Sequence, residues 1–270
     1  MNIKQLTENA EGKILSGVQD NVGYLVINNP ERYNAMSLEM WEAAAEAIDT
    51  MAIDPEVRLL VVTGTGGKAF VSGADISKFG EERSSKEAVD HYAKISGGCY
   101  DALENFPKPT IAAIKGFCIG GGLNLAVCCD IRIAEEKSRF GVPAAKLGLG
   151  YGYTGIRRLA KIISTSSIVE IFSTARQFSS QEAYEMGLIN RVLTGDMFDH
   201  YLNNYTTSIK GNAPITIAAV KAATLAVHQD PDKRDLEGIE KMVQSCFESA
   251  DYKEGQQAFM EKRKPKFTGK

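Results

Sequence analysis

The chain has 270 residues, of which 44% are hydrophobic and 24% charged, and its 31 basic and 34 acidic side chains give a formal net charge of −3. This composition supplies a core for one large domain or two small ones, and it excludes collagen-like and disordered chains. The near balance of charge predicts no nucleic-acid partner, because nucleic-acid-binding proteins usually carry a concentrated basic face.

Cysteine usage and the first residues predict a cytoplasmic protein. The five cysteines are odd in number and form no C-x-x-C pair with a histidine cluster, so we expect reduced, buried thiols and no metal site. Residues 1–13 contain several charges and no apolar stretch, unlike a secretory signal or a transit peptide. No uncharged apolar run is long enough to cross a bilayer, which predicts no membrane association.

The N-terminal part of the chain predicts a hairpin, a helix and a buried strand. Residues 13–19 and 22–28 have strand character and flank an Asp-Asn pair that favours a turn. Ser37 can cap a helix whose apolar residues recur at helical spacing. Residues 58–63 follow as a strand, whose unbroken Leu-Val character suits a sheet covered by helices on both faces.

A strand, a glycine-rich turn and a helix then recur. The segment 69–76 precedes a long helix predicted over residues 85–105, and the strand-like residues 110–116 precede the glycines 120–122 and a short apolar helix. A further strand is predicted over residues 130–134. This repetition predicts an α/β fold of stacked units rather than separate domains.

The remainder of the chain is predicted to be mainly helical. A short helix follows Ser179 and ends at Gly187, and three or more helices continue to Lys264. These last helices carry more apolar side chains than a solvated extension needs, so we expect them to pack on the body or on another subunit; examples are Ile217, Val220, Leu225 and Val227.

Two glycine turns are candidates for a chemical site. Residues 72–75 (SGAD) and 119–122 (IGGG) each place free backbone N–H groups at the start of a helix, and such fixed donors suit an oxyanion if the preceding strands lie side by side. Glycine permits close approach and positive φ angles there. Tight turns without a catalytic role are the alternative. Asp75 is interpreted as the N-cap of the following helix.

Six segments of the chain form a recognisable set. They are NNPERYNAM (28–36), AFVSGADI (69–76), KPTIAAIKGFCIGGGLNLAVCCDIRIA (108–134), FGVPAAKLGLG (140–150), SSQEAYEMGLINRV (179–192) and EGQQAFMEKRKPKF (254–267). Together they resemble the crotonase superfamily, also called the enoyl-CoA hydratase/isomerase family. The resemblance covers nearly the whole chain, and six motifs in one order are far more specific than any single one.

The resemblance implies an α/β fold in which ββα repeats form a spiral. Residues 1–200 would form the catalytic domain, and residues 201–270 a helical C-terminal trimerisation region that gives a homotrimer or a hexamer, a dimer of trimers. The resemblance also implies an acyl-CoA thioester as substrate. No cofactor is expected, because CoA is part of the substrate.

The same resemblance assigns roles to individual residues. The backbone N–H groups of Ala74 and Gly121 would hold the thioester oxygen as it becomes an enolate, in agreement with the argument from the glycine turns. Asn124 and Tyr151 are the other candidate catalytic residues. The residues expected to contact the substrate or CoA are Arg32, Ala35, Gly73, Asp75, Ile76, Gly120, Pro143, Ala144, Phe259 and Lys262.

Three of these residues would meet the CoA part of the substrate. Phe259 and Lys262 match the family positions that contact the nucleotide, often in a neighbouring subunit, and a lysine ammonium suits the 3′-phosphate. A solvated basic tail is the alternative for Lys262, because further basic residues follow it. Arg32 matches the other family position near CoA.

The chain departs from the family at the two catalytic glutamates of hydratases. The matching positions hold Asn124 and Ala144, and Gly152 stands where dienoyl isomerases have an aspartate. Hydration needs a base that activates water and an acid that protonates Cα, each worth a factor of ~10² to 10⁴ in rate. An amide can orient a water molecule but cannot take its proton, so the usual hydratase and isomerase mechanisms lack their acid and base.

Tyr151 favours a second reaction, the decarboxylation of a carboxylated acyl-CoA. It matches a tyrosine of methylmalonyl-CoA decarboxylase-like members, and loss of CO₂ generates an enolate without a general base. Those members, however, have a histidine in place of Ala74, and Tyr151 can equally be a wall of the pocket. Three functions stay open: a hydratase/isomerase-family enzyme that stabilises a thioester enolate, a decarboxylase or other lyase for a carboxylated acyl-CoA, and a non-catalytic CoA-thioester-binding scaffold.

Overall fold

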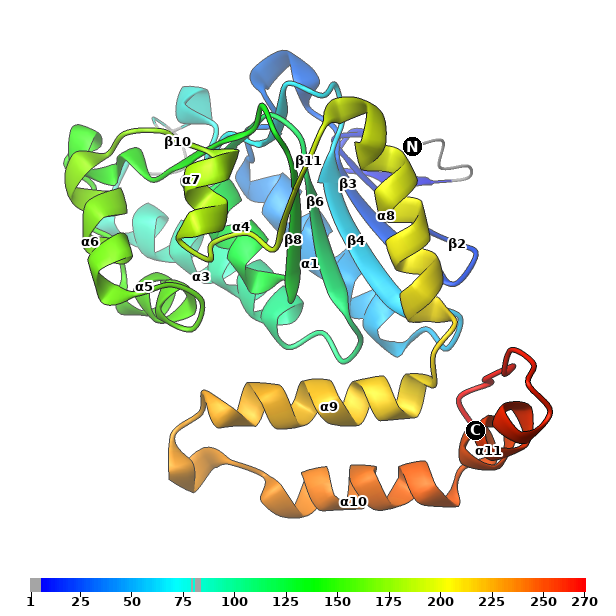
Figure 1. Cartoon of the computed structure of the whole chain (residues 1–270). Helices are drawn as coiled ribbons and strands as arrows, with labels where there is room; N and C mark the ends of the chain where they lie inside the picture. The colour runs from blue at the N-terminus through cyan, green and yellow to red at the C-terminus, as the bar shows by residue number, and fades with distance from the viewer. Residues whose placement is uncertain (1–5, 79, 81–83) are drawn as a thin grey trace.

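The computed structural model describes residues 6–78, 80 and 84–270, and it consists of a body and a helical arm (Figure 1). Residues 1–5 of the predicted catalytic domain lie outside the described residues. The body contains two β-sheets with helices around them, and the arm is formed by the last three α-helices. None of the described helices is long and apolar enough to cross a membrane.

In the part of the chain that the structure describes, the larger sheet has seven strands in the order β1-β2-β3-β4-β6-β8-β11. The first three strands are antiparallel, and the later neighbours are parallel. The turn between β2 and β3 has φ angles of 51° at Asp20 and 64° at Asn21, which both residue types tolerate, so the predicted hairpin is confirmed. The strands are β1 (Thr7–Asn9), β2 (Ile14–Gln19), β3 (Val22–Ile27), β4 (Leu59–Gly64), β6 (Thr110–Ile114), β8 (Ile131–Glu135) and β11 (Arg191–Leu193).

The smaller sheet runs beside the first one in the order β10-β9-β7-β5. Its members are β5 (Ala69–Val71), β7 (Phe117–Ile119), β9 (Arg139–Gly141) and β10 (Phe178–Ser179). Among the described residues, the α-helices of the body are α1 (Leu38–Ile53), α3 (Lys86–Glu104), α4 (Gly121–Cys128), α5 (Tyr153–Ala160), α6 (Thr165–Thr174), α7 (Ser180–Glu185) and α8 (Gly195–Lys210). The first unit, β2-β3-α1, places both strands in the larger sheet, and the repeats after it add one strand to each sheet and then a helix, as in β4-β5-α3 and β6-β7-α4. The predicted spiral of ββα repeats is therefore confirmed.

Strand β4 is buried from both sides, as its sequence predicts. Leu60 and Val62 belong to the main hydrophobic core, which also contains residues of α1 and α3. Leu59 and Val61 point to the other face, where they pack in a second cluster with Phe198 of α8. Both faces of the larger sheet are thus covered by helices, which explains why this strand has no alternating pattern.

Serine residues stand at the predicted starts of three helices. Ser37 occupies the N-cap of α1, but its side chain makes no capping hydrogen bond there. The Ser85 side chain accepts a hydrogen bond from the Ala88 N–H at 3.2 Å, and Ser179 forms a capping box with Glu182 at the start of α7. The position of each helix start is confirmed, although the capping interaction at Ser37 is not formed.

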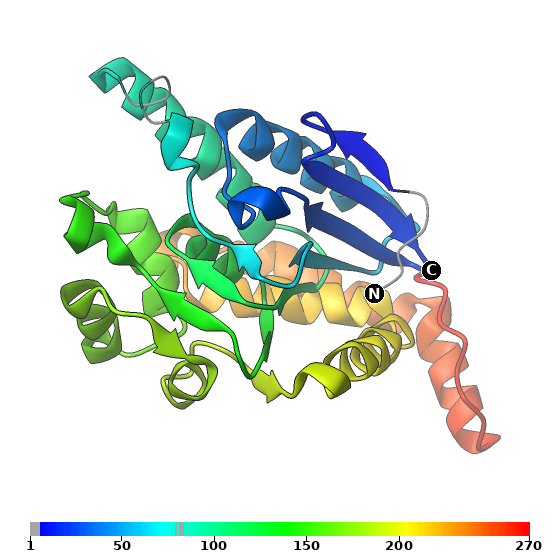
Figure 2. The same ribbon diagram turned by 90° about the horizontal axis from the view of Figure 1, so that it is seen from above.

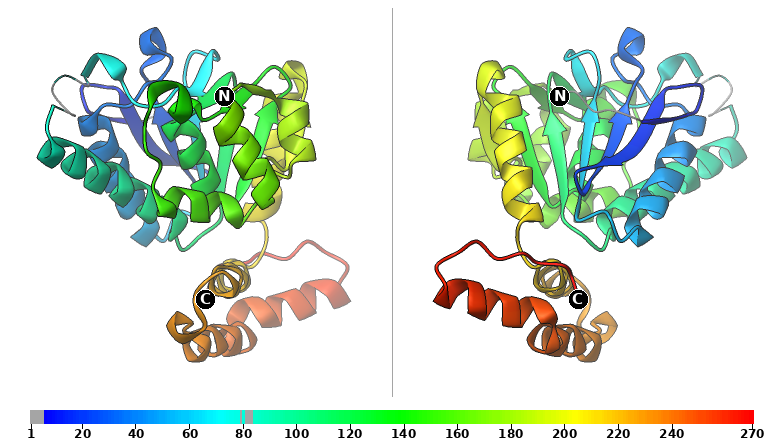
Figure 3. Two further views of the ribbon diagram at one scale, coloured as in Figure 1. Left: turned by 90° about the vertical axis from the view of Figure 1, so that its left-hand side faces the viewer. Right: turned by 90° about the vertical axis from the view of Figure 1, so that its right-hand side faces the viewer.

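The arm consists of α9 (Pro214–Val227), α10 (Leu236–Glu248) and α11 (Ala250–Met260), and it projects from the body (Figures 2 and 3). The Lys221 ammonium on α9 joins it to the body through Asp130, at 2.7 Å. Helix α8 instead packs against the larger sheet through Phe198 and Leu202. Residue 200, the predicted end of the catalytic domain, lies inside α8. The apolar face of this helix covers the larger sheet, so the whole helix packs on the body.

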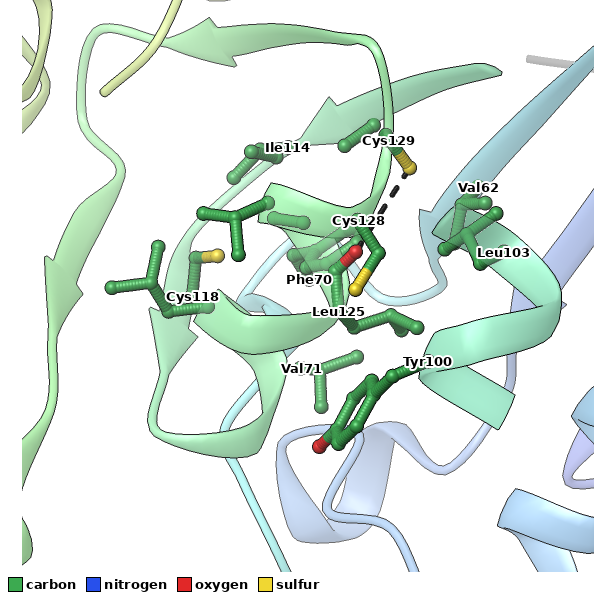
Figure 4. Packing of buried hydrophobic residues seen from close by; sticks show 14 of the residues in the cluster. Val62, Phe70, Val71, Tyr100, Leu103, Ile114, Cys118, Leu125, Cys128 and Cys129 are labelled. Carbon is green, nitrogen blue, oxygen red and sulfur yellow. Dashed lines mark hydrogen bonds between the residues drawn. The ribbon is translucent and has the colours of Figure 1, made fainter. Parts of the chain in front are cut away.

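All five cysteines are free, and four of them are buried. Cys118, Cys128 and Cys129 lie in the core around α4 (Figure 4), and Cys99 lies on α3. Burial raises the pKa of the Cys99 and Cys129 thiols to about 12, which keeps them in the thiol form at neutral pH. The prediction of buried thiols is confirmed for these four and wrong for Cys246, which is half-buried in the arm.

Candidate active site

The two glycine turns predicted from the sequence lie side by side. Strands β5 and β7 pair in parallel, with Val71 opposite Cys118, so the turns that follow them leave the sheet at the same edge. A Cβ built on Gly73 would come within 3.9 Å of the Gly121 nitrogen. The sequence predicts a shared site if the strands that precede the two turns are neighbours, and β5 and β7 are neighbours.

Ala74 is held in place by a backbone bridge to Met36. The Met36 N–H donates to the Gly73 carbonyl at 2.9 Å, and the Asp75 N–H donates to the Met36 carbonyl at 2.9 Å. Successive backbone amides of an extended segment point to opposite sides, so the Ala74 N–H points away from Met36. Gly73 has a φ of 115°, a conformation that favours glycine and allows the chain to turn at this point.

Gly121 is the first residue of α4, after Gly120 at the N-cap. Its N–H therefore belongs to the donors of a helix start that have no acceptor within the helix, and the helix dipole favours negative charge near it. Gly122 lies against β5, where a Cβ would come 2.1 Å from the Val71 carbonyl oxygen. The triple glycine thus lets the start of α4 approach the neighbouring strand closely.

Aromatic side chains that the sequence analysis did not single out surround this helix start. The Tyr100 hydroxyl donates to the Gly121 carbonyl at 3.2 Å. The Trp41 ring stands edge-on to Tyr100, with 5.0 Å between ring centroids, and its Nε1–H donates to the Tyr92 hydroxyl at 2.8 Å. The spacing of Tyr92 and Tyr100 on one face of α3 was an available signal, since buried tyrosines usually have a hydrogen-bond partner.

Asn124 and Ala144 are both nearly buried, at 9% and 8% exposure. Asn124 lies one helical turn after Gly121 and therefore on the same face of α4. Its Oδ1 atom is buried and has no hydrogen-bond partner among the described residues. Ala144 lies in the 3-10 turn η3 (Pro143–Leu147), which Pro143 begins. Neither of the two positions expected to hold a catalytic glutamate supplies a carboxylate.

Tyr151 lies in a mostly buried position next to α6. Its ring stands edge-on to Phe172 with 4.6 Å between centroids. Burial, together with the nearby Cys128 thiol, raises the pKa of Tyr151 to about 12. Its hydroxyl makes no hydrogen bond with the residues that the structure describes, so a protonated phenol remains available to a ligand.

Arg158 anchors α5 to α3. Its Nε donates to Glu104 at 2.9 Å and its Nη2 to Asp101 at 2.5 Å, while Lys161 also bonds Glu104. Burial works to raise the pKa of Glu104, but the hydrogen bonds and charges of Lys161 and Arg158 outweigh it and leave this pKa below its usual value. Both carboxylates are thus committed to ion pairs rather than available as a general base.

Replacing Arg158 by methionine is expected to destabilise the protein. Arg158 is 4% exposed and donates to both Glu104 and Asp101, while Glu104 keeps Lys161 as a partner. The loss of hydrogen bonds to charged groups typically costs about 1.5–3 kcal/mol. Because the pKa of Glu104 is lowered on folding, its contribution is present above the unfolded pKa of about 4.5 and is lost as the pH falls through the folded value. Urea unfolding of Arg158→Met and of the wild-type protein between pH 2 and 7 should show lower stability of the variant at neutral pH and a weaker decline below about pH 4.5.

The neighbouring Arg157→Met provides the matched control. Arg157 is exposed, and surface substitutions usually change stability by no more than about 0.5 kcal/mol. Equal unfolding midpoints for the two variants would contradict the anchoring role of Arg158.

Arg32 and Asp75 meet beside the first glycine turn. The Asp75 carboxylate accepts hydrogen bonds from the Ser77 N–H at 3.0 Å and the Ser77 hydroxyl at 2.7 Å. It therefore caps the 3-10 turn η2 (Ile76–Lys78), which confirms the capping interpretation. The Arg32 guanidinium donates to the same hydroxyl at 2.7 Å and keeps a side chain 56% exposed to solvent.

The remaining predicted contact residues are divided between the body and the arm. Ala35 is buried near the bridge at Met36, and Ile76 is 64% exposed beside the glycine turn. Phe259 is 83% exposed on α11, and Lys262 follows this helix. Within one chain, α11 lies away from α4 (Figure 1). A single chain therefore does not bring Phe259 and Lys262 together with the glycine turns.

No group of three or more His, Cys, Asp or Glu side chains in the described ranges is placed to hold a metal ion. The candidate site consists instead of backbone N–H groups, aromatic rings and two uncharged polar side chains, Asn124 and Tyr151. These groups can bind and orient an anionic oxygen atom.

Comparison with known proteins extends over nearly the entire chain. Residues 17–270 match the family model described as enoyl-CoA hydratase/isomerase. A crotonyl-CoA hydratase of Syntrophomonas wolfei is 32% identical over 252 residues, which cover 93% of this chain and 96% of the relative. A peroxisomal Delta(3,5)-Delta(2,4)-dienoyl-CoA isomerase of Arabidopsis thaliana is 30% identical over 265 residues, covering 94% and 95%. The crystal structure of an enoyl-CoA hydratase/carnithine racemase from Magnetospirillum magneticum has a TM-score of 0.92 at 31% identity and covers 98% of this chain and 97% of its own.

The fold and these similarities define an enzyme with a crotonase fold. The chain belongs to the enoyl-CoA hydratase/isomerase family. The resemblance inferred from the six motifs is thereby confirmed.

Proposed function

We propose that this enzyme binds an acyl-CoA thioester and stabilises its enolate on the backbone N–H groups of Ala74 and Gly121. The observation that carries this proposal is the adjacency of the two turns, with 3.9 Å between a Cβ built on Gly73 and the Gly121 nitrogen. Donors fixed in an enclosed site stabilise developing charge far better than water, and the loss of one typically lowers the rate by a factor of ~10² to 10³.

The reaction proceeds without the two hydratase glutamates. Asn124 and Ala144 cannot accept a proton at those positions, and Asp101 and Glu104 are paired with Arg158. A buried acceptor without a partner costs about 1–3 kcal/mol. The Asn124 Oδ1 atom can therefore accept a hydrogen bond from a donor on the substrate or from a water molecule next to the substrate.

Decarboxylation of a carboxylated acyl-CoA is the second candidate. Its support is Tyr151, whose raised pKa keeps the hydroxyl protonated and able to donate to a substrate carboxylate. When the bond between Cα and the carboxylate breaks, the electron pair passes to the thioester and forms the enolate directly, so no base is required. Binding of CoA thioesters without turnover is the third candidate.

One set of assays separates these functions. The enzyme is incubated with crotonyl-CoA, malonyl-CoA and methylmalonyl-CoA, and the loss of enoyl absorbance and the release of CO₂ are followed; butyryl-CoA serves as an unreactive ligand for affinity. Release of CO₂ supports the decarboxylase. Hydration at an ordinary enzymatic rate would contradict the inference that the enzyme lacks the usual pair of catalytic glutamates because Asn124 and Ala144 stand at their positions. Tight binding with no turnover of any thioester would support the scaffold instead of an enzyme.

The arm is proposed to assemble the enzyme into a homotrimer or a hexamer. Apolar side chains are exposed along it, including Val220 (61%), Phe247 (57%) and Phe259 (83%), around a groove of about 770 Å³ between α9, α10 and α11. A neighbouring chain on this surface would bury it and would bring Phe259 and Lys262 toward the CoA of another subunit.

Light scattering on the purified chain should therefore give about three or six times the mass of 29.4 kDa. Val220→Asp places a charge on the exposed apolar surface and is expected to lower that mass, because burying an unpaired charge is costly. His228→Asp, at an exposed position after the same helix, should leave the mass unchanged. A monomeric wild-type chain at micromolar concentration would contradict the assembly.

A further inference from the structure

Three consecutive glycines begin α4, and each is held by a different part of the body. The Gly120 N–H donates to the Gly141 carbonyl on β9 at 2.8 Å. Gly122 is in close contact with Val71 on β5. Gly121 lies between them. The Gly120 carbonyl, which shares a peptide plane with the Gly121 N–H, accepts the Asn124 N–H at 3.1 Å. Glycine adds no side-chain packing, so any further restraint on this backbone comes from neighbouring elements.

The contact to Gly121 comes from Tyr100. The Tyr100 hydroxyl donates to the Gly121 carbonyl at 3.2 Å, and a Cβ on Gly121 would lie 3.0 Å from the same hydroxyl oxygen. Figure 4 shows the Tyr100 side chain extending from its helix toward Val71. With 8% of Tyr100 exposed, the hydrogen bond is shielded from water, which strengthens it.

The ring of Tyr100 is itself fixed by its neighbours. Trp41 packs edge-on against it at 5.0 Å, and the Arg158 guanidinium lies 5.5 Å from its centroid. Burial raises the pKa of Tyr100 well above its ordinary value of 10, so the hydroxyl stays a donor through the neutral range. A side chain fixed by its neighbours, with a protonated hydroxyl, is well suited to restrain a backbone segment that has no side chains of its own.

We propose that Tyr100 is a positioning residue that aims the Gly121 N–H at the thioester oxygen by holding the Gly121 carbonyl. This proposal rests on the proposed function. The N–H and the carbonyl of Gly121 belong to two rigid peptide planes that meet at one Cα atom, so fixing one plane limits the directions open to the other. Catalysis by backbone donors depends on such preorganisation, since a donor that can turn away stabilises the developing charge less.

The test is the infrared carbonyl band of bound butyryl-CoA labelled with ¹³C at the thioester carbon. Hydrogen bonds from Ala74 and Gly121 should shift this band to lower frequency in the wild-type enzyme. Tyr100→Phe keeps the ring and removes the hydroxyl, so it should reduce the shift while changing the affinity for butyryl-CoA little. With the substrate that the assays above identify, kcat should fall about tenfold at nearly constant KM, less than the loss of a whole donor.

Tyr24→Phe is the matched control, because Tyr24 also packs against a hydrophobic cluster, but on the opposite face of the larger sheet, where it does not contact Gly121, Tyr100 or Trp41. It should keep the wild-type shift even if the protein is less stable. Replacing Tyr100 by 3,5-difluorotyrosine, which donates more strongly at the same shape, should enlarge the shift and provides a second variant if Tyr100→Phe does not fold. If both Tyr100 variants keep the wild-type shift, the positioning role of Tyr100 is overturned, while the enolate proposal stands. Absence of any shift in the wild-type enzyme would overturn the enolate proposal, and the role of Tyr100 with it.

Discussion

Carboxylates introduced at positions 124 and 144 are expected to give this enzyme measurable enoyl-CoA hydratase activity. The double variant Asn124→Glu with Ala144→Glu supplies a base to activate water and an acid to protonate Cα. Both positions are nearly buried, and residue 124 lies one helical turn from Gly121. Hydration of crotonyl-CoA, measured by the loss of enoyl absorbance, should rise by at least a factor of ~10², the lower value for a single general acid or base.

The matched control is the double variant Asn124→Gln with Ala144→Gln. Glutamine has the size and shape of glutamate but cannot take a proton, so hydration should stay at the wild-type rate. This control separates the effect of the new carboxylates from the effect of filling the space beside Ala144. A Glu pair that is folded by circular dichroism, binds butyryl-CoA and gains no activity would count against the assignment of Ala74 and Gly121 as donors.

The second large effect is expected from Gly122→Ala. The added methyl group would come 2.1 Å from the Val71 carbonyl oxygen, so the start of α4 must move away from β5. Overpacking of this kind costs about 1–3 kcal/mol or more. Moving α4 also separates Gly121 from Ala74, and turnover should fall by a factor of ~10² to 10³, as for the loss of one donor. Urea unfolding and steady-state kinetics measure the two effects.

Gly98→Ala tests whether these losses come from the location of the glycine. Gly98 lies inside α3, and nothing lies within 4 Å of a Cβ built there. The same substitution should therefore stabilise the protein by about 0.5–1 kcal/mol through helix propensity. Normal turnover in Gly122→Ala, with Gly98→Ala also active, would refute the close approach of α4 to β5 as a requirement for catalysis.

The glycine turns could be predicted from the sequence because their requirements are local. A positive φ at Gly73 and a close backbone approach at Gly122 each demand a glycine at that position. The adjacency of the two turns followed from the repeated order of strand, turn and helix, since consecutive units of an α/β fold stack beside one another. Local chemistry and topology were together sufficient for this part of the site.

The contacts of Tyr100 and Arg158 could not be predicted in the same way. The Tyr100 hydroxyl and its acceptor are 21 residues apart, and Arg158 and Asp101 are 57 residues apart. These pairs depend on the packing of α3 against α4 and α5, and no periodicity within either segment specifies it. Residue 200, the predicted boundary, lies inside α8, and the apolar face of this helix does not by itself reveal which surface it covers.

The burial of Cys128 has a consequence for an enzyme that handles thioesters. A thiolate close to an acyl-CoA can take the acyl group by thioester exchange and leave the protein acylated. Cys128 lies on the face of α4 that carries Asn124, and its Sγ donates to the Asn124 carbonyl at 3.1 Å. Burial raises the pKa of this thiol well above its usual value, and only the thiolate is a competent nucleophile. Burial of Cys128 beside the candidate site therefore also prevents the enzyme's own thiol from taking the acyl group of the thioester.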